Sequence, residues 1–106
     1  MKRDIFQAIA DPTRRAILLL IAAQAMTPNA LAEQFHSTRQ AVSKHIKVLT
    51  DSELLKQEKV GREIYYHLNA EKIGEIDKWL QQFKALFEKR FNQLDEVLHN
   101  LKTNEK

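Results

Sequence analysis

The chain of 106 residues contains no cysteine. This absence excludes disulfide bonds and thiolate nucleophiles, and it excludes cysteine ligands for zinc or iron–sulfur centres. Long apolar runs are also missing, because the longest uncharged stretch, 16–26, is too short to span a bilayer and is interrupted by Gln24. The first residues enter an amphipathic pattern without the apolar stretch of a secretory signal. We therefore expect a cytoplasmic protein with no membrane partner.

The excess of basic residues is small, with a formal net charge of +3, and it is unevenly distributed. Residues 1–70 contain ten Lys or Arg against seven Asp or Glu, whereas residues 71–106 contain seven of each kind. The stretch 34–50 holds Arg39, Lys44 and Lys47 and no acid. Composition alone does not establish nucleic-acid binding. Whether this basic stretch binds nucleic acid depends on where it lies in the fold.

Proline is scarce as well, and both prolines mark the start of a predicted helix. Asp11-Pro12 and Thr27-Pro28 each combine an N-cap residue with a proline at the first helical position. They predict helices at 12–24 and 28–35, which follow a short first helix over 2–10. The apolar spacing predicts the following inner-face residues in the second and third helices: Ile17, Leu20, Ile21, Leu31 and Phe35.

A fourth helix is predicted after the polar break at His36, and it runs to about Ser52. Either Ser37 or Thr38 suits its N-cap position. Val42, Ile46 and Leu49 recur at helical spacing and form its inner face.

Alternating apolar and polar residues predict two strands after the fourth helix, over 55–60 and 63–68. Gly61 can adopt the positive φ of a tight hairpin turn, so the segment 54–68 is predicted to be a two-stranded ribbon. Tyr65 and Tyr66 alternate on the second strand, and we expect Tyr66 to pack in the core while Tyr65 is exposed.

Asn69 is the predicted N-cap of a last helix over 70–101, on the order of 45 Å long at about 1.5 Å per residue. Its apolar residues are spaced by three or four throughout. A core of this size cannot cover the whole stripe, so we expect the distal half to pack on a second copy of the chain. Aromatic residues at this spacing can also line a ligand pocket, but an interface is the more frequent arrangement. The predicted dimerisation residues are Phe6, Trp79, Phe83, Phe87, Phe91, Leu94 and Leu98.

Three short helices followed by a β-ribbon is the order of a winged helix-turn-helix. Here the helix pair lies within 28–52 and the wing at 54–68. The second helix of such a pair lies in the major groove of DNA. Its outward side chains are expected to reach bases and phosphates, and two further cations lie near the tip of the wing. The residues predicted in this way to contact duplex DNA are Arg39, Gln40, Ser43, Lys44, Lys47, Lys59 and Arg62.

Three other residues have two possible roles. His45 either reaches DNA or packs at the edge of the core. Arg14 and Arg15 either touch phosphate or form ion pairs with Asp11 or Glu33.

Several motifs together resemble the ArsR-type family of winged-helix repressors. They are Asp11-Pro12-Thr13-Arg14-Arg15, Leu31-Ala32-Glu33, the run from Arg39 to Leu49 that contains Ala-Val-Ser-Lys-His, Gly61-Arg62-Glu63 and Tyr65-Tyr66. The resemblance implies a mainly α fold of order αααα-ββ-α with a small β-hairpin. It also implies a homodimer that represses transcription, with DNA contacts from Ser37 and Thr38 through Lys47. The tail resembles a subgroup of autorepressors within that family.

The chain departs from this family at two places. Glu53 stands where the family commonly has glycine after the fourth helix, so the turn there differs or carries strain of about 1 kcal/mol. The cysteines of metal-sensing members are missing, and the last helix has only His99 beside scattered acids. We therefore predict no metal site and no cofactor.

The sequence leaves the effector open. An unidentified protein or small molecule can act on the regulator, and a site of histidines and carboxylates for metal is a further alternative. A protein-interaction module with vestigial DNA binding is the alternative from another class. An enzyme is not predicted, because the sequence has no Gly-rich phosphate loop and no arrangement of catalytic residues.

Overall fold

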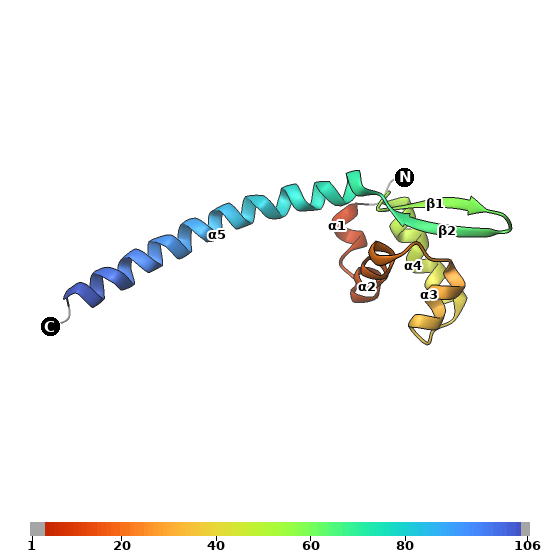
Figure 1. Ribbon diagram of the computed structural model, residues 1–106, viewed down its shortest axis with the longest axis horizontal. Coiled ribbons are helices and arrows are strands. Elements are labelled where there is room, and N and C mark those ends of the chain that lie inside the picture. Colours follow the sequence, from red (N-terminus) through yellow and green to blue (C-terminus); the bar gives the residue numbers. More distant parts are fainter. Residues whose placement is uncertain (1–3, 105–106) are drawn as a thin grey trace. The chain divides into compact units, whose positions relative to one another are not determined.

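The computed structural model describes residues 4–104, in which helices alternate with short turns up to a single β-hairpin (Figure 1). The elements in chain order are α1 Ile5–Ala8, α2 Pro12–Ala23, α3 Pro28–Gln34, α4 Arg39–Asp51, β1 Leu55–Val60, β2 Glu63–Leu68 and α5 Ala70–Asn104. This order confirms the predicted αααα-ββ-α fold. The predicted first helix begins at Lys2, which lies outside the described residues. The chain forms two compact units, one up to Gly74 and the other from Glu75 onward.

Side-chain caps set the starts of the first four helices. Asp4, Asp11, Thr27 and Thr38 each accept a hydrogen bond from a backbone N–H of the first turn, with distances of 2.9–3.2 Å. Such caps satisfy N–H groups that have no partner within the helix. Thr38, and not Ser37, is therefore the N-cap of α4.

The core of the first unit lies between the helices and the base of the hairpin. Val42, Ile46 and Leu49 are buried, as the helical spacing predicted. The α2 face differs in one residue, because Leu18 is buried and Leu20 is only half-buried. Phe35 is also only half-buried, since it is the C-cap residue of α3 rather than a residue of its inner face.

The helices α3 and α4 both end in Schellman motifs, in which the residue after the C-cap has positive φ. For α3 this residue is His36, with φ 50°, and the N–H of Ser37 donates to the carbonyl of Ala32 over 3.1 Å. For α4 it is Glu53, with φ 67°, and the N–H of Leu54 donates to the carbonyl of Leu49 over 3.0 Å. Glu53 thus occupies the left-handed conformation that glycine adopts without strain, which agrees with the strained alternative of the two expected for this turn.

The hairpin pairs Leu55 with Leu68 at its base and Val60 with Glu63 at its tip, and Gly61 has φ 65° in the turn. Met26 pairs with Tyr66 outside the hairpin, through hydrogen bonds of 3.3 and 2.9 Å. This bridge ties β2 to the residue that precedes the cap of α3. Tyr65 and Tyr66 are both half-buried, so the expected contrast between them is wrong.

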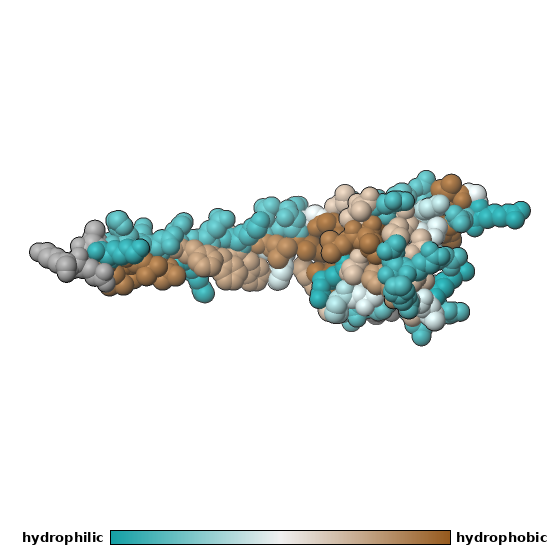
Figure 2. Space-filling model, turned by 60° about the horizontal axis from the view of Figure 1, so that its bottom comes forward, coloured by the Kyte–Doolittle hydropathy of each residue, from teal (hydrophilic) through white to brown (hydrophobic). Residues whose placement is uncertain are grey.

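The helix α5 is continuous over 35 residues, or about 52 Å at 1.5 Å per residue. Figure 2 shows hydrophobic side chains along one side of it and hydrophilic side chains along another. Within residues 4–104, no helix combines the length and the apolar content that a membrane span requires.

Candidate nucleic-acid interface

The outward face of α4 is exposed and mainly basic. Its residues are Arg39, Gln40, Ser43, Lys44 and Lys47, and all five are exposed. The first turn of α4 contains no acid, although Lys47 pairs with Asp51 one turn later over 3.5 Å. Because the inner residues of α4 are buried in the core, this face is presented to solvent in a fixed orientation.

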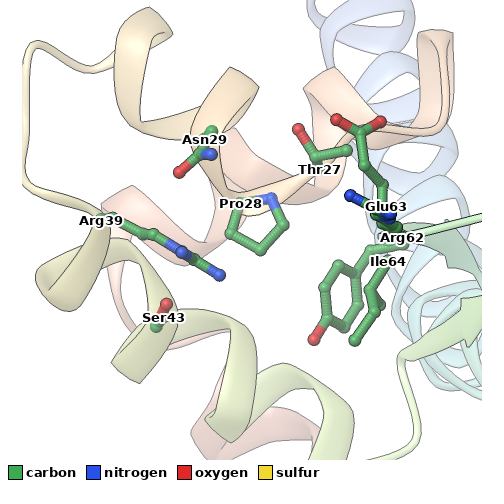
Figure 3. Close-up of a pocket in the computed structure, with 9 residues that line it drawn as sticks. Thr27, Pro28, Asn29, Arg39, Ser43, Arg62, Glu63 and Ile64 are labelled. Carbon is green, nitrogen blue, oxygen red and sulfur yellow. The ribbon is translucent and has the colours of Figure 1, made fainter. Parts of the chain in front are cut away.

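A groove of about 330 Å³ lies between α4 and the hairpin (Figure 3). In Figure 3 the side chain of Arg39 extends from α4 into this groove, while Arg62 and Ile64 line the opposite wall. The bridge between Met26 and Tyr66 holds β2 at the start of α3, whose first residues also line the groove. The groove is lined by Thr27, Pro28, Asn29, Arg39, Ser43, Arg62, Glu63, Ile64 and Tyr66. A more open hollow beside it is lined by Arg39, Gln40 and Ser43.

Two arginines and one acid therefore face the groove. The acid is Glu63, whose Oε2 accepts a hydrogen bond of 3.1 Å from the hydroxyl of Tyr65. This hydrogen bond, with the negative charge of Glu63, raises the pKa of Tyr65, because the phenol must keep its proton to donate. The carboxylate of Glu63 thus has a partner within the hairpin.

The remaining predicted DNA contacts lie at the two ends of this surface. Ser37 and Thr38 are exposed in the turn before α4, and the hydroxyl oxygen of Thr38 caps the helix. Lys59 is exposed on β1 opposite Ile64, and Arg62 is exposed in the turn of the hairpin.

His45 is placed differently from its neighbours on α4. Its Nδ1 lies 3.4 Å from Nη1 of Arg14 and 3.9 Å from Oδ2 of Asp11, and its side chain is only 28% exposed. The structure thus brings His45 to the edge of the core beside α2. Its contact with DNA stays a prediction.

Arg14 and Arg15 bind backbone carbonyls at the end of α1. Nε of Arg14 donates to the carbonyl of Ala8 over 2.6 Å, and Nη1 of Arg15 donates to that of Ile9 over 2.7 Å. The N–H of Arg14 hydrogen-bonds the Asp11 carboxylate over 2.9 Å, and this bond holds the pKa of Asp11 below its ordinary value of 3.8. Arg14 thus contacts Asp11 through a backbone hydrogen bond supported by the charge of its guanidinium, rather than through the expected ion pair between the two side chains.

Sequence reasoning missed Thr27 and Asn29 in the groove. The sequence pattern indicates Thr27 only as a helix cap and predicts no role for Asn29. A signal was present, since both flank the proline that opens the first helix of the helix-turn-helix pair, and this helix start approaches the DNA backbone in such motifs.

The predicted dimerisation residues on α5 are large apolar side chains that the single chain leaves exposed. Their exposed fractions run from 41% for Phe83 to 62% for Phe91. Trp79 and Phe83 form an edge-to-face ring pair, with centroids 4.6 Å apart. Phe6 of α1 is half-buried. Exposed apolar side chains lie on α5 at Trp79, Leu80, Phe83, Leu86, Phe87, Phe91, Leu94, Val97, Leu98 and Leu101.

Acidic and imidazole side chains do not gather into a metal centre in the part of the chain that the structure describes. No group of three or more His, Asp or Glu residues is close enough to share an ion among residues 4–104.

Comparison with known proteins agrees with this geometry. A family model described as a helix-turn-helix domain matches residues 9–58. The transcriptional repressor SdpR of Bacillus subtilis is 35% identical over 80 residues, which cover 76% of this chain and 89% of SdpR. A crystal structure of an ArsR family transcriptional regulator is 33% identical, covers 83% of this chain and 97% of that chain, and has a TM-score of 0.68.

The chain belongs to the ArsR family of helix-turn-helix transcriptional regulators. It is thus a DNA-binding regulator of transcription, and the predicted resemblance is confirmed. Within this winged helix-turn-helix fold, α4 is the second helix of the pair, which is the position of a recognition helix, and β1–β2 is the wing. The fold also matches a homodimeric winged helix-turn-helix domain from Mycobacterium bovis, at 21% identity and a TM-score of 0.64, over 76% of this chain and 75% of that one.

Proposed function

We propose that this ArsR-family protein is a homodimeric repressor that binds an inverted-repeat operator, with α4 in the major groove and the wing beside it. The observation that carries the proposal is the exposed basic face of α4, which adjoins a groove flanked by Arg39 and Arg62. A basic surface of this kind is complementary in charge to the phosphate backbone, and it carries side chains that can hydrogen-bond with bases. No catalytic step is part of the proposal.

Gln40 is the proposed base reader, because it is exposed near the amino end of α4 and its amide can form two hydrogen bonds with adenine. Lys44 and Lys47 are proposed to bind phosphate. Ser37 and Thr38 lie at the start of the helix, where contact with the DNA backbone is expected.

The groove between α4 and the wing is the proposed path of one DNA strand. A strand must pass there if α4 occupies a major groove and the wing contacts the neighbouring minor groove or backbone. Arg39 and Arg62 then bind the same strand from opposite walls, and Thr27 and Asn29 add polar contacts from the start of α3. Lys59 extends the same basic wall along the wing.

The second copy of the chain is proposed to pack on the apolar stripe of α5. Phe83, Phe87, Phe91, Leu94 and Leu98 are between 41% and 62% exposed in the single chain, which is costly unless a partner covers them. Phe6 and Trp79 complete the proposed interface. The chain then acts as one winged-helix domain over 1–106 in the cytoplasm, with a dimerisation helix at 70–101. Its proposed effector is an unidentified protein or a small molecule.

Selection of duplexes from a random pool by the purified protein tests this function. We expect an inverted repeat whose half-sites are about 34 Å apart, because the dimer axis relates two copies of α4. The control variant combines Arg39→Ala with Gln40→Ala, and it should enrich no sequence. Failure of the native protein to enrich any sequence contradicts the proposal, and so does a single site without symmetry.

A further inference from the structure

The side chain of Arg14, in the first turn of α2, hydrogen-bonds the end of α1. Its Nε donates to the carbonyl of Ala8 over 2.6 Å, and its Nη2 donates to the carbonyl of Gln7 over 3.3 Å. Carbonyls at the end of a helix have no partner within the helix, and a positive charge is favourable there. The guanidinium group of Arg14 therefore caps α1.

The same guanidinium group also reaches the recognition helix. Its Nη1 lies 3.4 Å from Nδ1 of His45 in α4. Arginine keeps its charge and can only donate, so this hydrogen bond requires an unprotonated Nδ1 on the imidazole. Nδ1 of His45 also lies 3.9 Å from Oδ2 of Asp11, the N-cap residue of α2. One nitrogen atom thus lies between a permanent donor and a carboxylate.

We propose that Arg14 and His45 form a protonation-sensitive contact that positions the recognition helix α4 relative to α1 and α2. In the neutral state, Nδ1 of His45 accepts a hydrogen bond from Arg14. In the protonated state, the same nitrogen donates, so its partner becomes Asp11, and the imidazolium repels the guanidinium. Protonation therefore moves the contact of His45 from the guanidinium of Arg14, which also caps α1, to the carboxylate of Asp11, which caps α2.

The position of His45 explains why this exchange matters for DNA. His45 directly follows Lys44 and precedes Lys47 by two residues, so a shift at His45 alters how the outward face of α4 meets the major groove. The charged groups that the structure places against the imidazole are Asp11 and Arg14, both at the start of α2, while α1 contributes backbone carbonyls through Arg14. The inference rests on the proposed DNA-binding function.

The test compares affinity for a duplex selected by the wild-type protein with affinity for a scrambled duplex, at pH 8 and at pH 5.5. Histidine changes its charge within this range. We expect the ratio of the two affinities to fall about threefold to tenfold on acidification of the wild type, as the loss of one hydrogen bond implies. His45→Asn keeps an acceptor oxygen near the position of Nδ1 and does not titrate, so its ratio should stay constant.

Two further variants separate positioning from general charge effects. Arg14→Lys replaces the planar fork, whose Nε and Nη1 reach Ala8 and His45 separately, with a single nitrogen atom on a flexible chain. Its ratio at pH 8 should therefore match that of the wild type at pH 5.5 and should not vary with pH. His67→Asn is the matched control, because His67 also lies beside a carboxylate, with Nε2 2.7 Å from Glu58, but in the wing. It should keep the pH dependence of the wild type. Parallel behaviour of the wild type and His45→Asn would overturn the inference.

Nuclear magnetic resonance of the protein without DNA supplies a second readout. The Nε–H signal of Arg14 should shift with the same midpoint as the imidazole of His45, and it should not follow His67. A signal of Arg14 that ignores the titration of His45 excludes the contact, even if the protein selects a duplex. If no duplex is selected but the two titrations coincide, the contact stands and the proposed DNA-binding function fails.

Discussion

Phe91 offers a sharp test of the proposed dimer, because 62% of it is exposed in the single chain. A phenylalanine has roughly 200 Å² of surface, so a partner that covers this fraction removes about 120 Å² from water. At about 25 cal/mol per Å², this burial contributes about 3 kcal/mol per copy. A symmetric dimer contains two copies, for a total of about 6 kcal/mol. Since about 1.4 kcal/mol is a factor of ten, Phe91→Ala should weaken the dimer by up to roughly four orders of magnitude.

The stronger variant combines Phe91→Asp with Leu94→Asp, which also places charges in the apolar interface. We expect it to be monomeric or aggregated in sedimentation velocity at micromolar concentration. Asn92→Asp with Gln93→Asp is the matched control, because it adds the same charge to the same turn at polar positions outside the stripe. A double variant at Phe91 and Leu94 that sediments as a stable dimer would refute the reasoning.

Two predictions concern the helix ends. Asp11→Ala should cost about 1 kcal/mol of unfolding free energy at neutral pH. Because the folded pKa of Asp11 lies below its ordinary value of 3.8, this contribution is present above that value and is lost as the pH falls through the lowered pKa, so the thermal melts of the two proteins should converge in strong acid. Glu53→Gly should be more stable than Glu53→Ala by about 1 kcal/mol, because both lose the carboxylate but only glycine relieves the positive φ. Equal stability of the two Glu53 variants contradicts a strained turn.

The sequence predicted the elements well because their signals are local. The Asp11-Pro12 and Thr27-Pro28 pairs locate the starts of α2 and α3, and Gly61 locates the hairpin turn. For the turn at Glu53, the family resemblance predicts either a different turn or strain, and the positive φ agrees with the second alternative. His36 adopts the same conformation without a sequence signal that distinguishes it from other polar turn residues.

The candidate site was predicted only in part, because its remaining features depend on tertiary contacts. The bridge between Met26 and Tyr66 brings Thr27 and Asn29 to the groove, and no local pattern reveals such a pairing. The same holds for His45 and Arg14, which are 31 residues apart in the chain. The choice between Leu18 and Leu20 in α2 depends on which neighbours cover each side, and helical spacing alone permits both.

The distinction between reading bases and holding the backbone is the central claim. It is tested by the affinities of Gln40→Ala and Arg62→Ala for the selected and the scrambled duplex at several salt concentrations. Gln40→Ala should cost about 1–3 kcal/mol per half-site on the selected duplex only, and it should relax the preference at one base position. Arg62→Ala should weaken both duplexes and lower the slope of log affinity against log salt by about one per wing. The account is contradicted if Gln40→Ala weakens both duplexes equally while Arg62→Ala changes base preference alone.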